Sequence, residues 1–206
     1  MFVTGAVLLL AMCQMWLFTP LFGPVRWLAV ASVGAMLCLC VWGNLRATGT
    51  WVGQRVAISP GLRLVTGLTV PAIALLLLLG SELGTLQVKN HLAVRFIFLL
   101  LWAFTQQFML QTVVLRETTA LLGRRPGQFV TAAFFGLLHL PNPLLAPVTF
   151  LAALGWCWVY DRHPNLVPIA LSHAAASLTL LIALGPNITG GMRVGYGYFL
   201  QQGSWL

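Results

Sequence analysis

Three glutamines and two histidines stand inside long apolar stretches of this sequence and are the residues with the potential for chemistry there. The glutamines are Gln106, Gln107 and Gln111, and the histidines are His139 and His173. In hydrocarbon each unsatisfied polar group costs several kcal/mol. Such side chains are therefore expected to face the interior of a helical bundle, at a functional site or at a helix–helix contact. Gln107 and Gln111 are four residues apart and would share one face of a helix, with Gln106 beside them.

The elements that must position these residues are apolar helices. Of the 206 residues, 59% are hydrophobic and 7% are charged, and the mean hydropathy is +0.91, whereas soluble domains carry roughly 25% charged residues. The composition predicts an all-α, polytopic membrane protein that forms a single domain over residues 1–206. The cysteines have spacing that suits neither a disulfide framework nor a metal site, and all lie in apolar runs: Cys13, Cys38, Cys40 and Cys157.

Seven apolar segments reach or approach the length that spans a bilayer. They cover residues 2–18, 27–42, 64–79, 92–122, 129–140, 144–160 and 166–184. We expect a polar linker over 43–63, an end to the fourth segment at 123–126, and an interfacial segment after Asn187. The loops that follow the second, fourth and sixth segments (loops two, four and six) hold seven Lys and Arg residues, whereas the parts of the chain on the other side of the membrane hold four. This excess predicts a cytoplasmic N-terminus rather than nucleic-acid binding.

The polar residues fall at a similar depth in three of these segments. At about 1.5 Å per helical residue, Gln106 and His173 each lie ~15–16 Å from the arginine that ends their segment, and His139 lies ~21 Å from its own. Three positions can coincide by chance. Three helices that deliver polar side chains to one level are nevertheless what a buried site requires.

The order of these residues resembles the CPBP superfamily, the CAAX-protease and bacteriocin-processing type of intramembrane endopeptidase. Its motifs are Glu-Glu-x-x-x-Arg, Phe-x-x-x-His and His-x-x-x-Asn. They correspond here to Gln106-Gln107-x-x-x-Gln111, Phe135-x-x-x-His139 and His173-x-x-x-Ser177. The resemblance covers about residues 92–184. It implies a multi-pass protein of a bacterial inner membrane that processes a membrane-associated or lipidated protein near its terminus and needs no cofactor.

The first motif departs from the family at every polar position. In the family the first glutamate is held to activate a water molecule, while histidines orient the water and stabilise the oxyanion. An amide cannot accept that proton, and losing a general base costs roughly 10²–10⁴ in rate. The acidic residues of the chain, Glu82, Glu117 and Asp161, are not expected to reach the site. A histidine can serve as the base instead, because its unperturbed pKa of ~6.5 suits that work.

Two hypotheses of different class follow. In the first, the protein is an endopeptidase in which Gln106 and Gln107 position water and His139 and His173 supply the base and the oxyanion donors. Gln111, Phe135 and Ser177 then support the site, and two histidines fall short of the three protein ligands of a catalytic zinc site. In the second, it is an inactive relative that binds a peptide or lipidated tail, as a maturation partner or immunity protein. A small transporter subunit is a third reading, supported only by the polar midplane. Which histidine would be the base is left open by the sequence.

Overall fold

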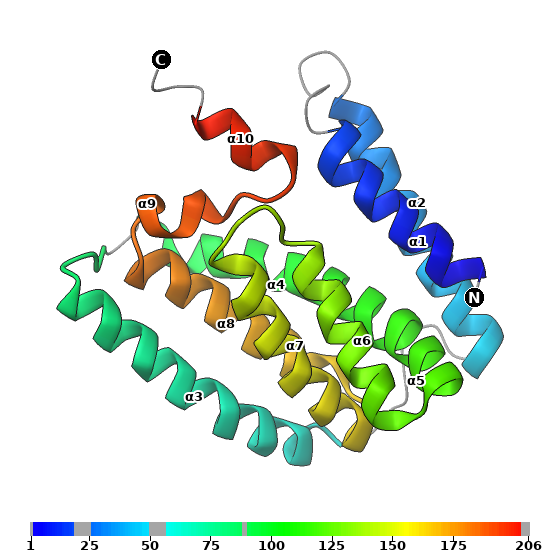
Figure 1. Cartoon of the computed structure of the whole chain (residues 1–206). Coiled ribbons are helices and arrows are strands. Elements are labelled where there is room, and N and C mark those ends of the chain that lie inside the picture. Colours follow the sequence, from blue (N-terminus) through cyan, green and yellow to red (C-terminus); the bar gives the residue numbers. More distant parts are fainter. Residues whose placement is uncertain (1, 19–25, 50–56, 88–89, 203–206) are drawn as a thin grey trace.

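The computed structural model describes residues 2–18, 26–49, 57–87 and 90–202. These residues form helices joined by short turns, with no strand among them (Figure 1). In chain order the elements are α1 (Phe2–Cys13) with a π-helix (Gln14–Phe18), α2 (Arg26–Thr48), α3 (Ile58–Glu82), α4 (Leu92–Met109), a second π-helix (Leu110–Leu115), α5 (Arg116–Leu122), α6 (Arg124–Leu137), α7 (Leu145–Arg162), α8 (Leu166–Ala183), α9 (Pro186–Thr189), a 3-10 turn (Gly190–Met192) and α10 (Tyr196–Gln202).

Every predicted apolar segment is helical, and the all-α membrane fold is confirmed. Three helical stretches are long and apolar enough to cross a bilayer: Ile58–Glu82, Leu92–Leu122 and Leu166–Ala183. Gly5–Trp16 and Val33–Thr48 are apolar but shorter. Seven spans therefore remain a prediction.

The centre of the molecule is made by α8, which packs against both α3 and α4, and by α7, which packs against α6. The α1–α2 pair lies to one side of this bundle (Figure 1). Helices α3 and α8 run parallel, because Gly61 at the start of α3 lies beside Pro168 while the Thr85 hydroxyl after α3 donates to the Ala183 carbonyl at 2.7 Å. A Cβ on Gly80 would lie 2.3 Å from that same carbonyl oxygen. Small residues of this kind let helix backbones approach closely in membranes.

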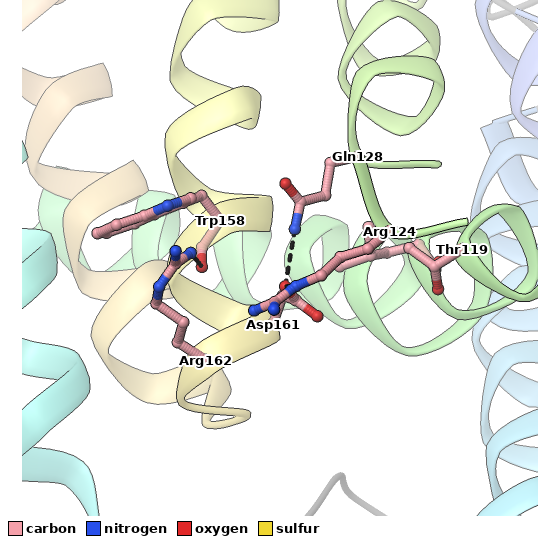
Figure 2. Close-up of polar contacts among 7 residues, drawn as sticks. Thr119, Arg124, Gln128, Trp158, Asp161 and Arg162 are labelled. Carbon is pink, nitrogen blue, oxygen red and sulfur yellow. Dashed lines mark hydrogen bonds and ion pairs between the residues drawn. The ribbon is translucent and has the colours of Figure 1, made fainter. Parts of the chain in front are cut away.

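Charged side chains gather where α5, α6 and α7 meet (Figure 2). Arg124 forms an ion pair with Asp161, and Gln128 donates to the same carboxylate oxygen at 2.8 Å. The Arg162 guanidinium lies 4.0 Å from the centre of the Trp158 ring. We call this part of the molecule the arginine-bearing end.

The end of α2 reaches the same place. Arg116 donates to the Gly43 carbonyl and to Asn44 Oδ1, both at 3.4 Å. The described residues of predicted loops two, four and six thus lie at one end of the bundle, as expected for loops on one side of a membrane. That this end faces the cytoplasm stays a prediction.

Two predicted boundaries are wrong. The linker over 43–63 is shorter, because α2 continues to Thr48 and α3 begins at Ile58; residues 50–56 lie outside the described chain. Arginine can occupy a helix end in a membrane, since its long side chain reaches the polar interface. Likewise α6 begins at Arg124 and not at 129, because Gly123 makes the turn with φ 85°. Pro126 then stands in the first turn, where its missing N–H would have no helical partner.

Candidate functional site

The three glutamines of α4 and the following π-helix have different surroundings. Gln107 is 0% exposed and Gln111 is 1% exposed, whereas Gln106 is half-buried and lines cavities. Gln111 Nε2 donates to Gln107 Oε1 at 2.9 Å, which is the four-residue pairing that the helix predicts. Gln111 lies within the π-helix Leu110–Leu115, and such wide turns are frequent at functional sites.

His173 of α8 continues this row of side chains. Its Nδ1 lies 3.3 Å from Gln107 Nε2. Because Gln107 Oε1 already accepts from Gln111, it is the amide N–H of Gln107 that faces the ring. In these amide orientations Nδ1 of His173 is therefore the acceptor, and the neutral ring carries its proton on Nε2.

His139, just after α6, is held in the opposite tautomer. Its Nδ1 lies 2.7 Å from the carbonyl oxygen of Phe135. A carbonyl only accepts, so Nδ1 must carry the proton, and Nε2 of the neutral ring keeps its lone pair. The Phe135 side chain, 0% exposed, packs between the two histidines, with ring centroids 4.7 Å from His139 and 5.8 Å from His173.

One cavity of about 200 Å³ brings three of the four predicted catalytic residues together, and Gln107 is not among them. Gln106, His139 and His173 all line it, and so does Ser177. Gln107 and Gln111 lie behind its wall and connect to it through His173. We call this the inner cavity. Its remaining lining is mainly apolar, with no carboxylate among the described residues that face it.

A second cavity, of about 110 Å³, lies between α1, α2 and α4 and shares Gln106 and His139 with the inner cavity. Its lining is almost entirely apolar and includes Met15, Met36 and Met109. Methionine adapts to varied apolar shapes. We call this the apolar cavity.

The segment after α8 covers both cavities at the end that lies away from the arginine-bearing end. Val194 lines both, and Met192 lines the inner one. Asn142, 0% exposed, holds this segment through Nδ2, which donates to the carbonyls of Thr189 at 2.8 Å and Arg193 at 3.0 Å. That the chain after 187 is interfacial stays a prediction; its described part also helps to close the site.

Sequence reasoning missed the support behind His173. The Trp156 ring stacks on the imidazole with centroids 4.5 Å apart. Trp156 Nε1 donates to Ser172 Oγ at 3.0 Å, and that hydroxyl is 2.6 Å from Thr69 Oγ1 on α3. Trp156 is one of eight tryptophans and has no spacing that marks it. Only the adjacency of Ser172 to His173 gave a signal.

A metal centre has no ligand set here, since no three His, Cys, Asp or Glu side chains of the described residues lie close enough to hold an ion. The inner cavity is lined by two imidazoles of opposite character: Nε2 of His139 can accept a proton, and Nε2–H of His173 can donate one. This pair suits acid–base chemistry without a cofactor.

Comparison with known proteins gives a family match over part of the chain. Residues 87–179 match a family model described as type II CAAX prenyl endopeptidase Rce1-like. Neither the curated proteins nor the solved structures gave a match. The matched region covers less than half of the chain and contains all three motifs, which supports membership of the CAAX-protease (CPBP) superfamily of membrane endopeptidases.

Proposed function

We propose that the protein is an intramembrane endopeptidase in which His139 is the general base and His173 the oxyanion donor. The observation that carries this is the difference between the two Nδ1 partners on the inner cavity, a backbone carbonyl at His139 and a side-chain amide nitrogen at His173, from which opposite tautomers are assigned. Nε2 of His139 has a lone pair with which to take a proton from water, and Nε2–H of His173 can donate to the carbonyl oxygen that becomes negative. Gln106, on the same wall, orients the water through its amide.

The substrate we propose is a membrane-associated or lipidated protein that is cut near its terminus. The apolar cavity supports this class, because it meets the inner cavity at Gln106 and His139. A hydrocarbon chain in the apolar cavity would place the adjoining peptide beside the two residues that act on it.

The test is cleavage of a fluorogenic peptide that ends in a prenylated CAAX sequence. We expect His139→Ala and His173→Ala each to abolish cleavage. The wild-type rate should rise with pH as the His139 imidazole loses its proton, because a protonated His139 has no lone pair to accept a proton. Equal cleavage by the wild type and both variants would refute this mechanism.

One observation favours a second candidate, an inactive relative that binds the same peptide without cutting it. No carboxylate of the described residues lines the inner or the apolar cavity. In that case wild type and both variants would all bind the peptide, and none would release a product.

A further inference from the structure

A third cavity, of about 220 Å³, lies at the arginine-bearing end, away from the two histidines. We call it the arginine-end cavity. Its polar lining comes from four elements and includes Asn44, Gln111, Arg116, Tyr160 and Asp161. Gln111 forms part of its wall, while His173 at the other end of the same hydrogen-bonded row faces the inner cavity.

Gln111 carries an unsatisfied atom at this wall. Its Nε2 is used by Gln107, but its buried Oε1 has no hydrogen-bond partner among the described residues. The Cys157 side chain forms a hydrogen bond with Gln111, but a thiol is only a weak donor and leaves Oε1 unsatisfied. A buried amide oxygen without a donor is costly in a low-dielectric interior. The arginine-end cavity is where a donor to this oxygen can sit.

Size and chemistry both point to water as that donor. A water molecule takes up about 30 Å³ and needs two to four polar partners, so the cavity has room for several. Its wall offers the guanidinium of Arg116 as a donor, the carboxylate of Asp161 as an acceptor and the hydroxyl of Tyr160 as either. Asp161 is already paired with Arg124 and Gln128 (Figure 2), so its negative charge does not need a bound cation.

We propose that the arginine-end cavity binds a cluster of water molecules and that the innermost one donates a hydrogen bond to Gln111 Oε1. This bond keeps the amide oxygen of Gln111 turned toward the water and its N–H turned toward Gln107. Gln107 then presents its own N–H to His173, whose proton is held on Nε2. Gln111 is thus a positioning residue that links hydration at one end of the protein to the tautomer of a histidine in the inner cavity.

The hydration is tested by cysteine labelling of the protein in lipid vesicles with a small, charged methanethiosulfonate. Thr112 lines the arginine-end cavity, and we expect Thr112→Cys to react above the background of the parent chain. Val113 is its 0% exposed neighbour and lines none of the three cavities. Since its labelling requires local opening of packed helices, Val113→Cys should react at least about tenfold more slowly. Leu101 is 63% exposed and lies within the candidate span Leu92–Leu122. It gives a third variant, Leu101→Cys, which a charged reagent should not reach if lipid covers it. Equal rates at 112 and 113, or no reaction at 112, would overturn the proposal.

The link to His173 is tested by ¹⁵N NMR of histidine-labelled protein, with His173→Asn used to assign the signals. We expect an unprotonated Nδ1 for His173 in the wild type, and in Gln111→Leu a mixture of tautomers, because nothing then orients Gln107. Thr179→Val is the control: Thr179 lines none of the three cavities, and its hydroxyl bonds its own helix at Ala175, so its removal should leave the tautomer unchanged. An unchanged His173 in a Gln111→Leu protein whose His139 signals are intact would refute the link. Neither measurement depends on peptidase activity, so both outcomes stand apart from the proposed function.

Discussion

Gln106 and Gln107 are adjacent and chemically identical, yet the structure gives them different work. Gln107 is fully buried and bonded on both sides, to Gln111 and to His173. Gln106 has a half-buried side chain on two cavity walls. Replacing each glutamine with Leu therefore distinguishes a residue that stabilises the fold from one that is needed only for peptide cleavage.

Replacing Gln107 with Leu leaves Gln111 Nε2 and His173 Nδ1 without their partner. Each orphaned buried group costs about 1–3 kcal/mol. Interhelical hydrogen bonds in membrane proteins average only about 0.6 kcal/mol, since the unfolded chain in lipid also finds partners. Between these limits, we expect Gln107→Leu to lower the free energy of unfolding by about 2 kcal/mol.

Gln106→Leu exchanges a cavity-lining amide for an apolar side chain of similar size and should change the free energy of unfolding by less than about 0.5 kcal/mol. Both variants should lose peptide cleavage. Gln107→Leu removes the partner that orients His173, and Gln106→Leu removes the amide that orients the water. The assay is equilibrium unfolding in mixed micelles with increasing SDS, alongside cleavage of the prenylated peptide. Equal stability of the two variants would show that the Gln111–Gln107–His173 row does not hold the bundle together.

Four further predictions use the same protein preparations. For the inactive relative, Gln106→Glu alone should not restore cleavage, because an uncompensated carboxyl in hydrocarbon stays protonated; Gln106→Glu with Gln111→Arg should give weak cleavage, measured with the same peptide. Asn142→Ala removes two hydrogen bonds to the chain after α8 and should speed amide hydrogen exchange over residues 190–195. Gly136→Val places a Cβ 2.9 Å from a carbonyl oxygen of α7 and should unfold at lower SDS, whereas Gly34→Val, with nothing within 4 Å, should not. Elemental analysis should find no stoichiometric zinc in the purified protein, because two histidines are too few ligands.

The sequence predicted the helices well because hydrophobic runs of this length have few alternatives in a membrane. It predicted the boundaries less well where arginine, proline and glycine meet. Gly123 and Pro126 read as the end of one segment and a gap before the next. In the structure the same residues make a single-residue turn and then the first turn of α6, because proline breaks a helix interior but not its start.

The site was predictable to the level of which residues face inward, and no further. The motif spacing identifies His139 and His173, but nothing in it says that their ring nitrogens are used in opposite senses. The role of each ring nitrogen depends on its hydrogen-bond partner. The partner of His173 is Gln107, which lies 66 residues away in the sequence, and the partner of His139 is the backbone carbonyl of Phe135, four residues away. The π-helix that contains Gln111 has no sequence mark either.

Replacing the charged motif by amides changes what must hold the site together. Two glutamates and an arginine would bring charges that need each other in hydrocarbon. Three glutamines are neutral, and each amide can donate on one side and accept on the other. Gln107 uses both sides, which passes the orientation of Gln111 to His173. The substitution therefore removes a carboxylate base from the first motif but supplies a directional row of hydrogen bonds. In the proposed mechanism that row makes His173 a donor, while His139 acts as the base.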